Sequence, residues 1–398
     1  MSKKVLIFTL FFIIACLLIN GCQHSCQSTN GNMPWELKDI DWFKKGNSWA
    51  FKGDYDRAIA DYNKALEVNP RYAEVYVNRG LAWDEKGDLN RAMADFNKAL
   101  EIKPGLAEAY LNRGNLWSKK GAFELAIADY NKALEMNPRL AIGYYTRGLH
   151  WYEKGDIDRA ISDYNQALEI DPYNVKAYVN RGIACKDKGD IALAIADYNK
   201  ALKINPNLTE AYVNRGLIWD EKGDFDQAIA DYNKALEINP RIAEAYLNRG
   251  TIWDKKSDFD RAIADFNRAL NINPQYASAY SNRGYTWFNK GNLDQAIADF
   301  TEALRINPRD AITYNNRGFT WGEKGNHDQA ISDYNKALEQ DPHFAEAYYN
   351  RGNSWAVKGD MQRALADVSK ALELKPENEE YKSCVIKFKS HIKESIKD

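Results

Sequence analysis

The chain has 398 residues, a formal net charge of −2 at pH 7 and five cysteines. A charge this close to zero argues against a nucleic-acid-binding protein, which usually has a large basic excess, and five cysteines are too few for a disulfide scaffold. With 45% hydrophobic and 13% aromatic residues, the composition excludes an intrinsically disordered chain and indicates a folded protein.

The first 21 residues differ in composition from the rest of the chain. Two lysines, Lys3 and Lys4, precede an apolar run over residues 5–19, which is shorter than the about 20 residues needed to span a bilayer. A basic start followed by a short apolar run is the pattern of a secretory signal, so we expect 1–21 to be a signal peptide. An uncleaved signal anchor is the alternative. Both place the bulk of the chain outside the cytoplasm, because the lysines stay inside.

The apolar run ends in Ile-Asn-Gly-Cys at 19–22, which resembles the lipobox of bacterial lipoproteins. The resemblance implies cleavage before Cys22 and a lipid anchor on that cysteine. Residues 22–38 are polar, lack apolar periodicity and read as a flexible tether. Gln23, in place of the Asp that often marks inner-membrane retention in that family, favours the outer membrane if the source is a diderm bacterium.

The body of the chain is one unit repeated ten times over 39–378, without insertion or deletion. Ten of the 11 prolines show it, because each follows the previous one by 34 residues: Pro70, Pro104, Pro138, Pro172, Pro206, Pro240, Pro274, Pro308, Pro342 and Pro376. We number the places of each repeat 1 to 34, so that the proline stands at place 32. A period of this length indicates a repeat architecture in which each unit packs on its neighbours.

The same places hold the same residue types in every repeat. Place 8 is Gly, and places 20 and 27 are Ala, in all ten repeats; place 11 is Trp in nine, with Cys185 in the fifth; place 24 is Tyr or Phe in nine. This pattern resembles the tetratricopeptide repeat (TPR). The resemblance implies an all-α, right-handed superhelical solenoid of ten 34-residue helix-turn-helix repeats, followed by a C-terminal capping helix at 379–398.

The spacing of these residues supports the same fold on physical grounds. Places 4, 8 and 11 share one face of a helix, and places 20, 24 and 27 share one face of a second helix. Small residues at places 8 and 20 allow a close crossing, which the aromatic residues fill. Gly at place 15 fits the end of the first helix, Asp or Asn at place 16 can cap the second, and Pro at place 32 stops it.

The sequence contains no catalytic constellation. It has no phosphate loop, nucleophile elbow or zinc-protease helix motif, and the five histidines occupy unrelated places. Residues 220–226 look superficially like a calcium loop but lack the glycine and the distal glutamate of an EF-hand. Cys185 is best explained as a small core residue. We therefore expect no enzyme activity, no cofactor and no metal.

Two polar places recur. Place 7 is Arg in nine repeats and place 23 is Asp in all ten, and the two lie at similar heights in an antiparallel helix pair. We predict an Arg–Asp ladder with a structural role, and ligand binding as the alternative. It joins Arg79, Arg113, Arg147, Arg181, Arg215, Arg249, Arg283, Arg317 and Arg351 to Asp95, Asp129, Asp163, Asp197, Asp231, Asp265, Asp299, Asp333 and Asp367.

The family resemblance implies that places 2, 5, 6, 9, 12 and 13 line a concave groove. At place 6, an Asn amide can bind the backbone of an extended peptide; a solvated groove floor inherited by duplication is the alternative. We predict a partner-binding groove formed by Asn78, Asn112, Asn180, Asn214, Asn248, Asn282, Asn316 and Asn350, with Tyr285, Phe288, Phe319 and Tyr349 as aromatic contacts.

These patterns together predict a lipid-anchored, extracytoplasmic, non-enzymatic scaffold that binds partner peptides or proteins in its groove. No nucleic acid is expected as a partner. One alternative is an assembly subunit of a cell-envelope or secretion complex that acts through its convex face and ends. Another is an enzyme with a glycan or phosphate site in the groove.

Overall fold

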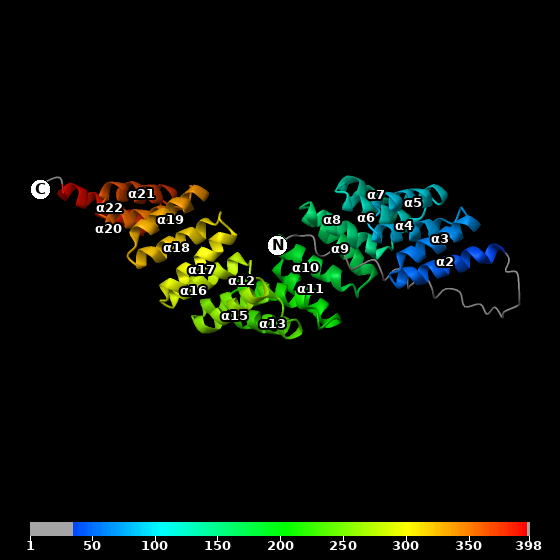
Figure 1. Ribbon diagram of the computed structural model, residues 1–398, viewed down its shortest axis with the longest axis horizontal. Helices are drawn as coiled ribbons and strands as arrows, with labels where there is room; N and C mark the ends of the chain where they lie inside the picture. Colours follow the sequence, from blue (N-terminus) through cyan, green and yellow to red (C-terminus); the bar gives the residue numbers. More distant parts are fainter. Residues whose placement is uncertain (1–34, 396–398) are drawn as a thin grey trace. The chain divides into compact units, whose positions relative to one another are not determined.

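The computed structural model describes residues 35–395, and every regular element within them is an α-helix (Figure 1). The expected signal peptide (1–21), the lipid-bearing Cys22 and most of the tether lie outside the described residues and stay predictions. One boundary differs from expectation, because helix α2 begins at Trp35 and residues 35–38 are helical rather than part of a tether. Pro34 precedes this helix, and proline favours a helix start.

Each repeat forms two antiparallel helices. The first helices are α2 (Trp35–Phe51), α4 (Ala73–Glu85), α6 (Ala107–Lys119), α8 (Ala141–Glu153), α10 (Val175–Lys188), α12 (Thr209–Glu221), α14 (Ala243–Lys255), α16 (Ala277–Asn289), α18 (Ala311–Glu323) and α20 (Ala345–Val357). The second helices are α3 (Tyr55–Val68), α5 (Leu89–Ile102), α7 (Phe123–Met136), α9 (Ile157–Ile170), α11 (Ile191–Ile204), α13 (Phe225–Ile238), α15 (Phe259–Ile272), α17 (Leu293–Ile306), α19 (His327–Gln340) and α21 (Met361–Leu374). A last helix, α22 (Glu379–Ser395), follows them.

The chain divides into two compact halves, Met1–Ile204 and Asn205–Asp398. In the N-terminal half the described helices form the first five repeats, α2–α11. In the C-terminal half they form the last five, α12–α21, together with α22. Inside each half, every second helix packs on the first helix of its own repeat and on that of the next. The predicted all-helical solenoid of ten repeats plus a final helix is confirmed.

The turn inside each repeat uses the residues that the sequence predicted. Nine of the place-15 glycines adopt a left-handed conformation with φ between 74° and 90°, and Ser257 takes the same conformation at φ 60° in the seventh repeat. The next residue, at place 16, caps the second helix in eight repeats by accepting a backbone N–H bond of 2.9–3.3 Å. These caps are Asp54, Asp88, Asp156, Asp190, Asp224, Asp258, Asn326 and Asp360.

The core of a repeat is the contact of the place-8 glycine with the place-24 ring. A Cβ atom added to Gly46 would lie 2.5 Å from Tyr62 Cε1, and one added to Gly80 would lie 2.7 Å from the ring of Phe96. Real Cβ atoms do not approach a neighbour this closely, so the predicted close crossing of the two helices depends on glycine. Both rings are fully or almost fully buried.

Helix α22 packs on the last repeat. Tyr381, Val385 and Phe388 are buried against α20 and α21. On the opposite side Ile386 is 68% exposed. No helix within residues 35–395 combines the length and the apolar character needed to cross a membrane.

Candidate functional site

The predicted Arg–Asp ladder is present in all nine repeats that carry the arginine. Each guanidinium holds its aspartate through two hydrogen bonds, Nε to Oδ2 at 2.7–2.8 Å and Nη2 to Oδ1 at 2.6–2.7 Å. These hydrogen bonds raise the pKa of Arg113 above its usual value. Paired, fork-like contacts of this kind are stronger than single ones.

The ladder also joins neighbouring repeats, which the sequence reasoning missed. In eight of these repeats the remaining guanidinium nitrogen, Nη1, donates to place 25 of the preceding repeat, for example from Arg79 to Asn63 at 2.6 Å and from Arg317 to Thr301 at 3.0 Å. The guanidinium carbon also lies 5.2 Å from the centre of the Tyr76 ring in the same helix as Arg79. Because both carboxylate oxygens and the rest of the guanidinium are engaged, the ladder is structural.

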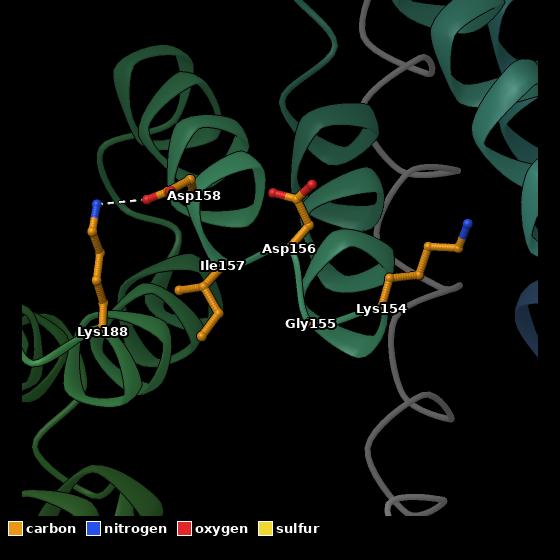
Figure 2. Close-up of a pocket in the computed structure, with 6 residues that line it drawn as sticks. All are labelled: Lys154, Gly155, Asp156, Ile157, Asp158 and Lys188. Atoms are coloured by element: carbon orange, nitrogen blue, oxygen red, sulfur yellow. Dashed lines mark hydrogen bonds and ion pairs between the residues drawn. The ribbon is translucent and has the colours of Figure 1, made fainter.

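A second set of ion pairs links the turns of successive repeats. Lys188 Nζ lies 2.6 Å from Asp158 Oδ1 of the preceding repeat. Figure 2 shows this pair at one edge of a shallow surface hollow, with Asp156 beside it and Lys154 directed away. Asp156 caps α9, and Lys154 pairs with Glu124. The polar groups of this hollow are therefore already engaged in holding the fold.

The first helices form the inner face of each half. Successive first helices contact each other directly, for example α4 with α6, α14 with α16 and α18 with α20, whereas the second helices are separated by them. Because successive repeats approach each other more closely at their first helices than at their second helices, each half curves toward its first helices. We use "inner face" for the side formed by places 2, 5, 6, 9, 12 and 13 of the first helices.

The predicted asparagines at place 6 are half-buried or buried between successive first helices. Four of them donate a hydrogen bond to the preceding repeat: Asn78 to Asn47 (2.8 Å), Asn180 to Tyr145 (3.0 Å), Asn282 to Thr251 (3.2 Å) and Asn350 to Asn315 (3.1 Å). These four amides therefore serve the packing of the first helices. Partner binding by the asparagines, including Asn112, Asn214, Asn248 and Asn316, stays a prediction.

The structure brings three of the four predicted aromatic residues to adjoining repeats on the inner face. Tyr285 is 48% exposed and Phe319 is 40% exposed, and the ring centres of Phe288 and Phe319 lie 5.5 Å apart. Ile312, which the sequence reasoning did not single out, is 63% exposed on the same face at place 2. We call Tyr285, Phe288, Ile312 and Phe319 the apolar patch.

The fourth predicted aromatic residue has another environment. The Tyr349 ring stacks on that of Tyr381 in α22, with centres 4.7 Å apart, and its hydroxyl donates to Glu380 at 2.8 Å. Tyr349 therefore lies where the final helix covers the end of the inner face.

Places 12 and 13 form a further set of bonds between repeats, which the sequence reasoning missed. Place 12 of one repeat meets place 13 of the next: Asp84 with Lys119 (2.6 Å), Tyr152 with Asp187 (2.5 Å) and Asp220 with Lys255 (2.7 Å). The sequence pattern that could have predicted the two ion pairs is a Lys at place 13 when place 12 of the preceding repeat is acidic. Asp254, at place 12 of the seventh repeat, has Asn289 at place 13 of the next repeat, and its Oδ1 has no hydrogen-bond partner within residues 35–395.

The structure places the side chains of His150 and Cys185 in the core. Within residues 35–395 no three His, Cys, Asp or Glu side chains are arranged to hold a metal ion. His150 is buried, with Nε2 at 2.5 Å from Ser118 Oγ and Nδ1 at 2.9 Å from the Thr146 carbonyl oxygen. Burial raises the pKa of the Cys185 thiol to about 11, which keeps it protonated and unreactive at neutral pH.

The structure is a solenoid of helical repeats whose first helices form an inner face. Comparison of the sequence with models of known families identifies the class of these repeats. The tetratricopeptide repeat model matches 107–140, 175–208, 209–242, 243–276 and 277–310. A second tetratricopeptide repeat model matches 43–107 and 322–379, and a third, described as TPR repeat, matches 151–189. The chain belongs to the tetratricopeptide repeat family.

Among the solved structures that resemble this chain, two share its fold with a TM-score of 0.50 or more. A tetratricopeptide repeat protein from Parabacteroides merdae is 24% identical, with a TM-score of 0.50 over 62% of this chain and 98% of that chain. The APC/C hetero-tetramer Cut9–Hcn1 is 17% identical, with a TM-score of 0.51 over 90% of this chain and 77% of that chain. YrrB, described as a TPR protein with an unusual peptide-binding site, is 25% identical, with a TM-score of 0.41 over 48% of this chain and 97% of that chain. No curated protein matches the chain.

Proposed function

We propose that this protein is a non-enzymatic scaffold that binds partner proteins or peptides on the inner face of its repeats. The observation that carries the proposal is the apolar patch. Tyr285, Ile312 and Phe319 leave 40–63% of their surface exposed, whereas the aromatic residues at place 24 are buried in the core. Exposed aromatic side chains surrounded by polar groups are typical of protein interfaces.

We further propose that the scaffold is anchored by lipid at Cys22 outside the cytoplasm, in the outer membrane if the source is a diderm bacterium. The sequence of residues 1–22 supports this part of the proposal. Incorporation of radiolabelled palmitate tests it, because the wild-type chain should take up the label and the Cys22→Ala chain should not. Equal labelling of both chains would contradict a lipid anchor at this residue.

Capture of partners by the full chain from an envelope extract tests the inner face. We expect the pair of substitutions Tyr285→Ala and Phe319→Ala to abolish capture of the proteins that the wild-type chain retains. Leu125→Ala is the matched control, because Leu125 is 50% exposed on the second helix α7, away from the inner face. If capture survives the double substitution but is lost on removal of 379–398, the end of the solenoid is the binding site.

A further inference from the structure

The chain itself shows what an acidic side chain at place 12 binds. Asp84 accepts two hydrogen bonds from Lys119 Nζ, at 2.6 and 2.7 Å, and its side chain is only 3% exposed beneath that lysine. Asp220 accepts one from Lys255 at 2.7 Å. In both cases the lysine comes from place 13 of the next repeat. A carboxylate at place 12 is therefore positioned to receive an ammonium or guanidinium group.

Asp254 has the same position but lacks the cation. The next repeat places Asn289 where Lys119 and Lys255 stand in the other two cases. Asp254 Oδ1 is buried and has no hydrogen-bond partner among the described residues. A buried carboxylate oxygen without a partner costs free energy. The Asp254 side chain as a whole is only half-buried, so a cation from another molecule can approach the carboxylate and offset that cost.

Among the described residues, helices α14, α16 and α18 carry carboxylates that form no ion pair, whereas their basic side chains are paired. Glu244, at the other end of α14, and Glu323, at the end of α18, form no ion pair within the part of the chain that the structure describes. The basic side chains of the same helices are engaged, since Lys255 pairs with Asp220 and Arg249 with Asp265. This part of the inner face thus offers carboxylates without cations, which complements a basic partner.

The apolar patch adjoins this carboxylate. Phe288 stands at place 12 of α16. Asp254 stands at the same place of α14, the first helix of the preceding repeat, and the two helices contact each other. The Phe288 ring contacts that of Phe319, whose helix α18 contacts α16. An acidic receptor and an exposed aromatic surface therefore lie side by side on three successive first helices.

We propose that the inner face of α14, α16 and α18 binds an extended segment of a partner protein through one basic and one apolar side chain. The Lys or Arg side chain pairs with Asp254, and the apolar side chain two residues away packs on Phe288 and Phe319. Residues two apart in an extended chain point to the same side, separated by about 7 Å. This inference rests on the proposed function and names the chemistry of its partner.

Fluorescence anisotropy with a labelled Gly-Lys-Ser-Phe-Ser-Gly peptide and the full chain tests the proposal. We expect saturable binding that weakens at high salt. Replacing the Lys of the peptide with Glu, or its Phe with Ala, should weaken binding about tenfold or more, as expected when one partner of an interface contact is removed. No binding of the Lys-Phe peptide, or equal binding of all three peptides, would overturn the proposal.

Two matched variants locate the basic contact. Asp254→Asn should weaken peptide binding about tenfold, whereas Asp84→Asn should leave it within about twofold, because Asp84 is already held by Lys119 inside the chain and its loss leaves Lys255 paired with Asp220. Both substitutions preserve side-chain shape, and circular dichroism verifies that both chains are folded. Equal effects of the two substitutions, or none from Asp254→Asn, would refute the role of Asp254.

The test distinguishes this inference from the proposed function. If Tyr285→Ala with Phe319→Ala abolishes partner capture but Asp254→Asn does not, the inner face binds partners of other chemistry and only this inference fails. If neither alters capture, the proposed function fails as well. A second copy of the chain as the occupant would appear as a dimer in analytical ultracentrifugation that Phe319→Ala dissociates, and that result also overturns the inference.

Discussion

Glycine at place 8 has a steric role that can be separated from its helix propensity. In α18, a Cβ atom at Gly318 would lie 2.9 Å from Tyr334 Cε1 and 3.1 Å from the backbone oxygen of Ala330. At Gly322, one turn later in the same helix, the nearest atom would be Ala330 Cβ at 4.0 Å, which is ordinary contact. The two glycines therefore lie in the same helix but differ in the room available for a Cβ atom.

We expect Gly318→Ala to lower the free energy of unfolding by about 1–3 kcal/mol, because overpacking forces the ring or the helix to move. Gly322→Ala should raise it by about 0.5–1 kcal/mol, because alanine favours the helix more than glycine does. Urea denaturation followed by circular dichroism measures both. Two changes of the same sign would contradict this account.

His150 gives the N-terminal half a pH-dependent contact. Burial lowers its pKa below the ordinary value of 6.5, against the hydrogen bond to the Thr146 carbonyl and the charge of Glu153, which raise it. The folded chain therefore holds this histidine neutral, while the unfolded chain takes up a proton near pH 6.5. Its contribution to stability is complete above that pH and is lost as the pH falls through the lower pKa of the folded state.

The wild-type chain should consequently lose more thermal stability between pH 7.5 and pH 5 than the His150→Leu chain does. Leucine is a suitable replacement because Leu116 occupies the same place in the preceding repeat. Melting temperatures recorded by circular dichroism at the two pH values provide the comparison. An identical pH dependence of the two chains would exclude His150 as its source.

At the scale of the helix pair, the fold was predictable where a residue acts inside one repeat. Gly80, Phe96 and the capping Asp88 each serve a contact within a single repeat, so their spacing in the sequence was sufficient to place them. The Arg–Asp ladder was predictable for the same reason, since Arg79 and Asp95 belong to one helix pair. Contacts that cross from one repeat to the next were missed.

Those missed contacts depend on which helices become neighbours in space. Asn63 receives a bond from Arg79 of the following repeat, and Asp84 receives one from Lys119, 35 residues away. Neither distance along the chain corresponds to a helix or turn period. The same limit applies to the site, because the empty position beside Asp254 becomes visible only once the pairing of places 12 and 13 is known.

Ion pairs of the ladder and of the turns should differ in strength. Arg249→Ala removes a fork-like pair from Asp265, whose side chain is 7% exposed, and we expect a loss of about 2–4 kcal/mol, because a buried charge is left without its partner. Lys256→Ala removes a pair with Asp226, whose side chain is 88% exposed, and should cost less than about 1 kcal/mol. Urea denaturation measures both changes, and equal losses would contradict the structural role of the ladder.

At the scale of the whole molecule, stability should follow the number of complete repeats. The contacts of a repeat lie within itself and with its immediate neighbours, as expected of a solenoid. Deleting one complete 34-residue repeat joins place 34 of the repeat before it to place 1 of the repeat after it, and these two places are also consecutive in the parent chain. Removing 107–140, for example, brings Arg147 to Asn97, which replaces Asn131 at the same place.

We expect the chain lacking 107–140 to keep its helical circular dichroism spectrum per residue and to unfold at a moderately lower urea concentration. Removing the 17 residues 107–123 instead deletes one helix of a pair and should disrupt cooperative unfolding. If both deletions have the same effect, the repeats are not the units of stability.

The direction of the bonds between repeats has a consequence for how the protein is made. Arg79 reaches back to Asn63, Asn78 to Asn47, Lys119 to Asp84 and Lys188 to Asp158, so these four donors come from the later repeat, whereas Tyr152 donates forward to Asp187. A repeat leaving the ribosome therefore finds the groups that it binds already in place on the repeat synthesised before it. Folding can advance from the N-terminus together with synthesis, one repeat at a time, without waiting for the remainder of the chain.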